Sequence, residues 1–185
     1  MTTEIIADAD HKMARAVDAM EREFQGVRTG RASTSLVERI TVDYYGTTTP
    51  LNQLAGISVP EPHQIVIQPW DRGVLGAIEK AITKSDIGLT PNVDGTVVRL
   101  NIPPLTEERR KDLVKVVHKR MEDAKVEIRN IRRDGADQLK KAERDGEVGA
   151  DEAHRYLDTL QKTTDRHIAD VDRRAAAKEH EVLEV

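Results

Sequence analysis

Apolar positions near the start of the chain follow a helical period. Within residues 3–29 they recur every three or four positions, which places them on one face of an amphipathic helix. That face is formed by Ile6, Ala9, Met13, Val17, Met20, Phe24 and Val27. Gly30 comes next, and a glycine just beyond a helix readily takes the left-handed conformation that ends it. The pattern predicts a helix over residues 3–29 with Gly30 as its stop.

Two longer helical patterns occupy the C-terminal part of the chain. The first begins at Thr106, a suitable N-cap followed by two glutamates that favour a helix start, and runs to about residue 145. The second covers about residues 151–183. Their apolar faces consist of Leu113, Val117, Met121, Ala124, Ile128, Ile131, Gly135, Leu139 and Ala142, and of Ala153, Leu157, Leu160, Thr164, Ile168, Val171, Ala175 and Val182. Gly135 has a poor helix propensity, so its place in this face predicts either close helix packing or a local bend.

Residues 35–104 follow a different pattern, in which short β-rich runs surround one helical stretch. The runs cover residues 35–46, 56–70 and 96–103, and the helical stretch covers residues 71–86. Prolines and glycines interrupt the pattern, as they do between strands. The region therefore predicts a small β/α/β module.

These patterns predict an α+β fold with two parts. At about 1.5 Å per residue, the helix from Thr106 extends over roughly 60 Å, which is too long for the small module to cover. The simplest arrangement is an elongated antiparallel three-helix bundle of residues 1–30 and 105–185, with a β/α/β domain inserted over residues 31–104. A single compact α+β domain and a coiled-coil dimer are the alternatives.

The chain crosses between the two predicted parts twice, and we expect a hinge at these crossings. They lie at about residues 30–31 and 103–106. The predicted hinge residues are Gly30, Arg31, Pro103, Pro104, Leu105 and Thr106. The two prolines favour an extended backbone and do not suit a helix interior. Gly30 is therefore interpreted as part of a joint as well as a helix stop.

Composition excludes several classes of protein. Charged residues make up 34% and apolar residues 38% of the chain, which is too charged for a membrane protein and too apolar for a disordered one. The absence of cysteine excludes disulfides and cysteine-bound metals. The acidic N-terminus does not resemble a signal peptide, and no apolar run is long enough to span a membrane. We therefore expect a soluble, cytoplasmic protein.

The sequence lacks motifs for catalysis, metal binding and nucleotide binding. "DEAH" at 151–154 has no accompanying phosphate-binding loop, and its acidic residues suit a helix start better than a helicase box. "RTGRAS" at 28–33 has one glycine and no lysine, which makes it a poor phosphate-binding loop. The histidines form no ligand pair, so we expect surface or boundary positions for His11, His63, His118, His154, His167 and His180. We predict no catalytic residue, no metal site and no cofactor.

The helix predicted over residues 106–145 carries a local excess of positive charge. It has 13 basic and 10 acidic residues, although the whole chain has a net charge of −4. One flank of this helix carries Lys111, Lys115, Lys125, Arg129, Arg132, Arg133 and Lys140. Two interpretations stay open: a solvated helix surface, and an edge that binds a polyanion. The chain has five aromatic residues, so the second interpretation favours structured RNA over a stacked single strand.

Five motifs then occur in an order that is typical of one protein family. They are "RTGRAS" (28–33), "YYG" (44–46), "SDIGLTPN" (85–92), "PPLTEERRKDL" (103–113) and "VEIRNIRRD" (126–134). Together they resemble the ribosome recycling factor family of bacteria and organelles, over essentially the full chain. "PPLTEERR" and "RNIRR" are the most specific parts of this resemblance.

The resemblance implies an L-shaped protein without enzymatic activity. A member of the family binds the post-termination ribosome on its large subunit, around the aminoacyl and peptidyl sites. With elongation factor G and GTP, it promotes dissociation of the subunits and release of mRNA and tRNA. The implied partners are large-subunit ribosomal RNA and elongation factor G with GTP, with no membrane involved, and we expect the chain to act as a monomer.

The resemblance and the basic flank together yield candidate RNA-binding residues. They are Arg28, Arg110, Lys125, Arg129, Arg132 and Arg133. Arg110, Arg129 and Arg132 follow from the family motifs, and the last two also lie on the basic flank. Arg110 rests on the resemblance alone. Arg28 and Arg31 are weaker candidates, which either contact RNA or steady the hinge.

Two other classes of function compete with this interpretation. A helical adaptor would use the basic edge to bind an acidic protein partner. An RNA-modifying enzyme would need a nucleophile, a metal or a nucleotide site, and the sequence carries no motif for any of them.

Overall fold

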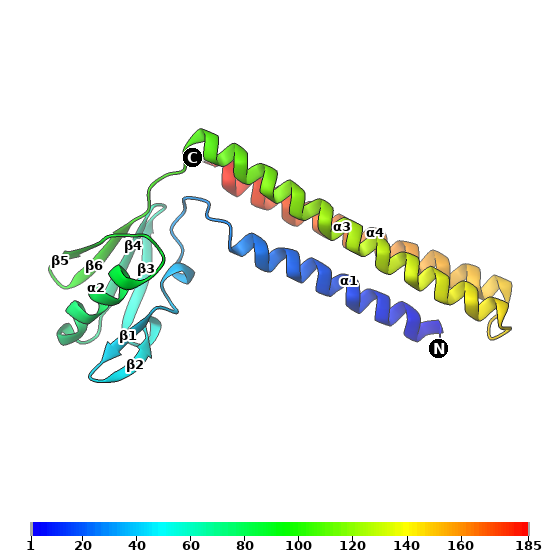
Figure 1. The fold of residues 1–185 in the computed structure, drawn as a ribbon, viewed down its shortest axis with the longest axis horizontal. Coiled ribbons are helices and arrows are strands. Elements are labelled where there is room, and N and C mark those ends of the chain that lie inside the picture. The colour runs from blue at the N-terminus through cyan, green and yellow to red at the C-terminus, as the bar shows by residue number, and fades with distance from the viewer. Residues whose placement is uncertain (1, 185) are drawn as a thin grey trace. The chain divides into compact units, whose positions relative to one another are not determined.

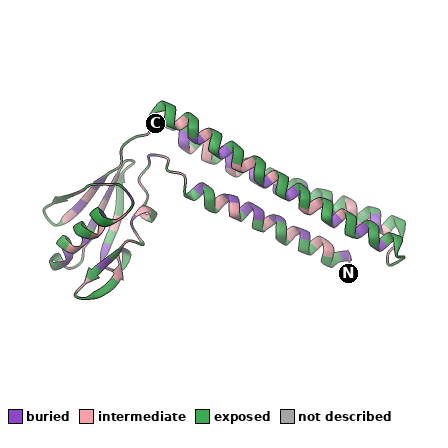
Figure 2. Cartoon of the chain, viewed as in Figure 1, coloured by how far each residue is buried: buried purple, intermediate pink, exposed green. Residues whose placement is uncertain are grey.

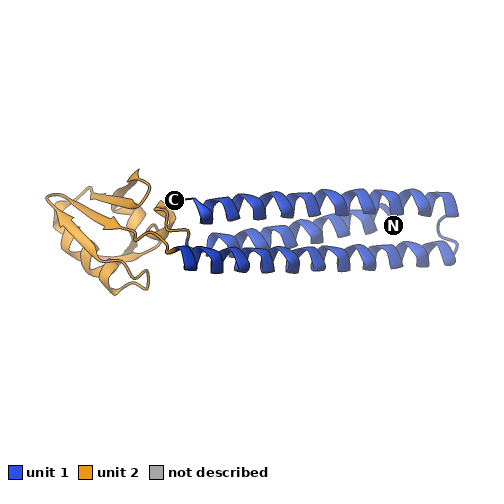
Figure 3. Ribbon diagram, turned by 90° about the horizontal axis from the view of Figure 1, so that it is seen from above, with its two compact units in different colours: residues 1–28, 107–185 blue, residues 29–106 orange. Residues whose placement is uncertain are grey.

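The computed structural model describes residues 2–184, and the chain divides into two compact units. Residues 1–28 and 107–185 form the first unit, here called the bundle (Figure 3). Residues 29–106 form the second, here called the inserted unit. Helices in one unit and an antiparallel sheet in the other confirm the predicted α+β class. No helix among the described residues is long and apolar enough to cross a membrane.

Three long helices form the bundle. They are α1 (Thr2–Gln25), α3 (Glu107–Arg144) and α4 (Ala150–Leu183), and they run side by side in Figures 1 and 3. Each turns its apolar face inward, as the buried positions in Figure 2 show. The completely inaccessible side chains include Met13, Met20, Val117, Ile128, Leu139 and Val171. Burial of such side chains contributes roughly 1.5–3 kcal/mol each, which stabilises helices that are otherwise highly charged.

The first helix is shorter than predicted, and Gly30 is not its stop. α1 ends at Gln25, where the Gly26 N–H donates to the Glu23 carbonyl oxygen (3.1 Å). The next amide repeats this three-residue spacing, which tightens the last turn and ends the helix. Gly26 is itself a poor helix former, and the apolar period that continues to Val27 masked this signal.

Gly135 lies where helices of the bundle pack closely. A Cβ atom at this position would lie 3.2 Å from Leu160 Cδ2 and 3.9 Å from Ala9 Cβ. The glycine therefore makes room for a leucine of α4 next to a residue of α1. Of the two predicted roles for Gly135, close helix packing is the one that the structure supports.

The "DEAH" letters begin a helix, as predicted. A turn with Gly146 at φ 73° ends α3, and α4 starts at Ala150. Asp151 and Glu152 lie in the first turn of α4, where carboxylates interact favourably with the exposed N–H groups.

The predicted surface or boundary position is wrong for one histidine, because His167 is buried with 8% of its surface exposed. Its Nε2 donates to Asp10 Oδ1 on α1 at 2.5 Å, and Arg166 pairs with the same oxygen at 2.8 Å. The hydrogen bond from His167 lowers the pKa of Asp10 from its ordinary value of 3.8. The sequence pattern could not show which flank of α4 is covered by α1.

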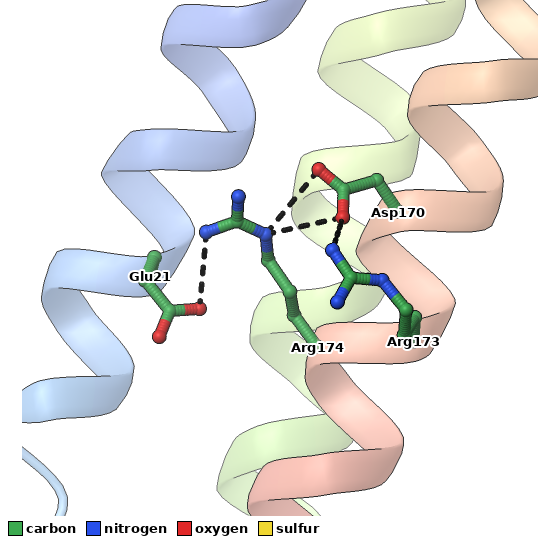
Figure 4. A network of polar contacts seen from close by, with 4 residues as sticks. All are labelled: Glu21, Asp170, Arg173 and Arg174. Carbon is green, nitrogen blue, oxygen red and sulfur yellow. Dashed lines mark hydrogen bonds and ion pairs between the residues drawn. The ribbon is translucent and has the colours of Figure 1, made fainter.

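A second polar network joins α1 to α4 (Figure 4). Arg174 Nη1 pairs with Glu21 Oε2 at 3.5 Å, and Arg174 Nε donates to both oxygens of Asp170 at 3.3 Å. Arg173 also donates to Asp170. Burial of the Asp170 carboxylate raises its pKa, but the hydrogen bonds and charges of the two arginines outweigh burial and lower the pKa from 3.8.

We expect Asp170 to make the bundle sensitive to acid. Because its pKa is lower in the folded chain than in the unfolded one, the stabilisation is present above pH 3.8 and is lost as the pH falls through the folded pKa. Asp170→Asn should lower the free energy of unfolding by roughly 1 kcal/mol at neutral pH and should flatten its decline in acid. Urea unfolding followed by circular dichroism from pH 7 to pH 3 measures both effects. Asp18→Asn, which removes an exposed carboxylate of α1, is the control; an equally steep acid decline in the two variants contradicts this account.

The inserted unit is built from six short strands and one helix. The hairpin of β1 (Thr41–Tyr44) and β2 (Thr47–Pro50) is separate from a four-stranded antiparallel sheet in the order β3-β4-β6-β5. The strands of that sheet are β3 (Ala55–Glu61), β4 (Gln64–Pro69), β5 (Pro91–Asp94) and β6 (Val97–Asn101), and α2 (Leu75–Lys84) connects β4 to β5. Short 3-10 turns occur at Thr34–Leu36, Leu51–Gln53 and Arg72–Val74. Ile65, Ile67, Val98 and Leu100 of the sheet share one apolar core with Ile78 and Ile82 of α2.

Two of these strands were not predicted. β2 consists of three threonines and a proline without a buried side chain, and three of the four residues of β5 are exposed. Such strands lack the apolar alternation that identifies a strand in a sequence, and pairing with a neighbouring strand defines them instead.

Candidate nucleic-acid interface

Three arginines on α3 form the centre of the candidate interface, and we call them the arginine face: Arg129, Arg132 and Arg133. Arg129 and Arg133 are exposed and, within residues 2–184, make no hydrogen bond or ion pair. Arg132 is partly buried, and its Nη1 donates to Gln161 Oε1 on α4 at 3.3 Å. Residues three and four positions apart lie on one side of a helix, so the three guanidinium groups project from one region of the bundle. Such groups can donate two hydrogen bonds to one phosphate.

The arginine face borders a groove between α3 and α4 with a volume of about 440 Å³. Its polar and charged lining residues are Arg132, Arg133, Asp137 and Lys140 of α3, with His154, Asp158 and Gln161 of α4. The groove therefore combines three permanent positive charges with two carboxylates. Sequence reasoning missed the residues from α4, because only the packing of the two helices brings them beside the arginines.

Lys125 is less available for RNA than predicted. Its side chain is 14% exposed, and its Nζ lies 2.5 Å from Asp172 Oδ1 on α4. Glu122 Oε1 lies 3.9 Å from the same Nζ. Because a partly buried ion pair is costly to break by removing one partner, this lysine serves the packing of α3 on α4.

The other two candidates lie away from the arginine face. Arg110 is partly buried in the first turn of α3, and its buried Nε has no hydrogen-bond partner in the described part of the chain. At about 1.5 Å per residue, position 110 is roughly 28 Å from position 129 along the helix axis. Arg28 is exposed at the end of the bundle's first segment. The structure therefore does not gather all six candidates into one cluster.

Three of the predicted hinge residues, Gly30, Pro104 and Leu105, meet within the inserted unit. Gly30 is buried with φ 76°, and a Cβ there would lie 3.2 Å from the backbone nitrogen of Leu105 and 3.7 Å from Pro104 Cα. His63 Nδ1 donates to the Gly30 carbonyl oxygen at 2.7 Å. The two connections, separated by 75 positions in the sequence, therefore touch, and only a residue without a side chain fits at this contact.

The turn between β3 and β4 holds both connections. The Ala32 N–H donates to the Pro62 carbonyl oxygen at 2.7 Å, and the Ile102 N–H donates to the His63 carbonyl oxygen at 2.8 Å. Together with the His63 side chain, this turn fixes residues 30–32 and 102 to the inserted unit.

A long helical bundle that presents two exposed arginines without partners among residues 2–184 on one helix is typical of proteins that bind a polyanion through a helix surface. Among residues 2–184, no three histidine, aspartate or glutamate side chains are arranged to hold a metal ion.

Comparison of the chain with known proteins narrows this class to one family. The family model described as "Ribosome recycling factor" matches residues 20–183. The chain is 57% identical to the ribosome-recycling factor of Geobacillus sp. and 54% identical to that of Halalkalibacterium halodurans, over 100% of both chains in each comparison. The chain belongs to the ribosome recycling factor family.

Solved structures agree with this assignment. A solution structure of a ribosome recycling factor aligns with 100% of this chain and 98% of its own, at 45% identity and a TM-score of 0.77. The T. thermophilus ribosome recycling factor, in a model with E. coli elongation factor G bound to the E. coli post-termination complex, aligns over 100% of both chains, at 44% identity and a TM-score of 0.64.

Proposed function

We propose that this chain recycles ribosomes. It binds the post-termination ribosome and, together with elongation factor G and GTP, promotes dissociation of the subunits and release of mRNA and tRNA. The observation that carries this proposal is identity of more than half of all residues with ribosome-recycling factors over the full length. The protein is not an enzyme: it acts by binding, and the GTPase supplies the energy. Because ribosomes are in the cytoplasm, the chain acts there.

The arginine face is the proposed contact with large-subunit ribosomal RNA. The guanidinium groups of Arg129 and Arg133 are exposed and have no competing partner among the described residues, and guanidinium geometry suits phosphate. Lys140 widens the surface along the groove. Arg110 is a second proposed contact, because its partly exposed side chain lies in the first turn of α3 and belongs to the family motif that implies an RNA contact.

The two connections between the units form the proposed hinge. The contact of Gly30 with Leu105 and the bonds from the β3–β4 turn support this role, because they hold the connections together where they leave the inserted unit. Arg28 belongs to the bundle and Arg31 to the inserted unit, so the two lie on opposite sides of the proposed pivot. The hinge would let the inserted unit move while the bundle stays bound to RNA.

Subunit splitting tests the function directly. Post-termination ribosomes are mixed with the chain, elongation factor G and GTP, and dissociation is followed by light scattering. We expect splitting only when all three components are present. A helical adaptor would leave the ribosomes intact and would remain in the supernatant after ribosome pelleting, and that result would overturn the proposal.

A further inference from the structure

The groove between α3 and α4 contains negative charges that a phosphate-binding surface does not need. Its charged lining residues include Asp137 of α3, Asp158 of α4 and the basic Arg132, Arg133 and Lys140. A carboxylate is repelled by an RNA phosphate next to it, which lowers the affinity for a polyanion. Contact with phosphates alone therefore accounts for the basic residues of the groove and leaves its carboxylates unexplained.

The carboxylate of Asp137 is available to a ligand. The side chain is exposed, and within residues 2–184 it makes no hydrogen bond or ion pair. Arg133 and Lys140 lie four and three positions away on the same helix, a spacing at which opposite charges often pair. Asp158 is less available, because His154 Nε2 lies 3.6 Å from its Oδ2. Asp137 is therefore an acceptor that can meet a donor from outside the chain.

Polar contacts with α4 hold the side chain of Arg132 in place. Arg132 Nη1 donates to Gln161 Oε1 at 3.3 Å, and Gln161 Nε2 donates to Asp165 Oδ1 at 2.9 Å. The amide of Gln161 is thus engaged at both its oxygen and its nitrogen. The other N–H groups of Arg132 can still donate to a phosphate. The groove therefore combines an ordered donor with a free acceptor.

Apolar side chains also line this groove. They are Ala136 of α3 with Leu157 and Leu160 of α4. Leu160 is buried, and the other two are partly buried. The volume of about 440 Å³ lies within the range of roughly 300–1,000 Å³ that is usual for sites of small ligands. A row of phosphates needs neither an apolar surface nor a hollow, whereas the flat face of an unstacked RNA base suits both.

An RNA base supplies the donor that a phosphate lacks. Phosphate oxygens only accept hydrogen bonds, whereas bases carry N–H groups on their Watson–Crick edges. Guanine has two neighbouring N–H groups on that edge, which match the two oxygens of one carboxylate. A guanosine nucleotide therefore presents an acceptor for arginine, a flat face for the apolar side chains and a pair of donors for Asp137.

We propose that the groove between α3 and α4 binds one unpaired guanosine nucleotide of large-subunit ribosomal RNA. The inference rests on the proposed function, in which the arginine face binds this RNA. Arg132 and Arg133 donate to the phosphate, and Ala136 and Leu157 contact the face of the base. Asp137 accepts hydrogen bonds from the N1–H and the amino group of guanine. The arginines thus position the RNA backbone, and the carboxylate recognises a base.

The sign of the effect at Asp137 tests this proposal. We expect Asp137→Asn to weaken binding of the full chain to isolated large subunits about fivefold or more, because an amide offers one acceptor and sets its own donor against a donor of guanine. A carboxylate that only borders phosphates gives the opposite sign, since loss of its negative charge strengthens binding. Titration of labelled protein with large subunits measures the affinity. The slope of log affinity against log salt concentration should stay unchanged, because a contact with a base releases no counterion.

Asp134→Asn is the matched control for this substitution. Asp134 lies on α3 close to Asp137, is exposed and has no partner within residues 2–184, but it is not among the residues that line the groove. The control removes the same charge, so we expect its affinity to equal that of the unchanged chain or to exceed it slightly. Equal or tighter binding of Asp137→Asn overturns the inference and leaves the proposed function intact.

Chemical probing with kethoxal identifies the base, because this reagent modifies unpaired guanine at N1 and at the amino group. Large subunits are treated with and without saturating protein, and the modified positions are mapped by primer extension. We expect the unchanged chain and Asp134→Asn to protect a guanine that stays reactive with Asp137→Asn. Absence of such a guanine overturns the inference even if Asp137→Asn binds weakly, since the carboxylate then meets a 2′-hydroxyl group or a ribosomal protein. Failure of the unchanged chain to bind large subunits would refute the proposed function itself.

Discussion

The Arg129→Ala/Arg132→Ala variant should bind large ribosomal subunits at least 100-fold more weakly than the unchanged chain. A hydrogen bond between two groups of which one is charged contributes about 1.5–3 kcal/mol, and this variant removes two such donors. Arg129 has no partner among the described residues, so its loss leaves no buried carboxylate behind. Arg132 loses only a hydrogen bond to the amide oxygen of Gln161. The fold should therefore survive while binding fails.

Salt dependence makes this prediction specific. If each arginine neutralises one phosphate, the slope of log affinity against log salt concentration should decrease by about two in the double variant. Titration of labelled protein with large subunits at several potassium concentrations measures this slope. A loss of net charge alone would weaken binding through long-range electrostatics. The affinity for large subunits would then fall by the same amount wherever the removed charges lie.

A matched variant controls for net charge. Arg15→Ala/Arg22→Ala removes two exposed arginines from α1, and in the described part of the chain these also lack ion pairs. It changes the net charge by the same amount but leaves the arginine face intact. We expect its affinity and slope to match those of the unchanged chain. Equal slopes in the two double variants would show that the arginine face is not the RNA contact.

The periodic pattern of apolar residues predicted the helices of the bundle, because burial of those residues determines where the helices form. Residues such as Met13, Ile128 and Val171 recur at helical spacing and are completely inaccessible in the structure. The same reasoning failed at the end of α1, where a local glycine ended the helix before the apolar period did. It also missed β2 and β5, because pairing with a neighbouring strand defines these two strands and an apolar pattern does not.

The candidate site was only partly predictable, for a related reason. Residues on one helix face can be read from their spacing, so Arg129, Arg132 and Arg133 were grouped correctly on α3. Contacts between helices cannot be read in this way. The ion pair of Lys125 with Asp172 spans 47 positions, and nothing in the local sequence of either residue indicates it. Sequence reasoning therefore finds the charges of a surface more readily than it finds which of them are already neutralised.

The second large expected effect follows from the predicted hinge and concerns a substitution at Gly30. Gly30→Val should destabilise the inserted unit by roughly 2–4 kcal/mol. A non-glycine residue at a positive φ costs about 1–3 kcal/mol, and here the added Cβ would also lie 3.2 Å from a backbone nitrogen of Leu105 that cannot move without displacing the second connection. Displacing that connection should slow subunit splitting several-fold. Large-subunit affinity should be retained, because the bundle does not contain Gly30.

Gly88 separates backbone strain from the contact at the hinge. Its φ is 70°, close to that of Gly30, but nothing lies within 4 Å of a Cβ built there. Gly88→Val should therefore show the cost of the backbone conformation alone and split ribosomes at the normal rate. Amide hydrogen exchange of the β4 and β6 backbone measures the stability of the inserted unit, and light scattering measures splitting. Equal splitting rates in the two variants would mean that the contact between Gly30 and Leu105 has no part in recycling. A slower rate for Gly30→Val alone, with normal large-subunit binding, assigns the defect to the connections, because only that variant forces the two segments apart.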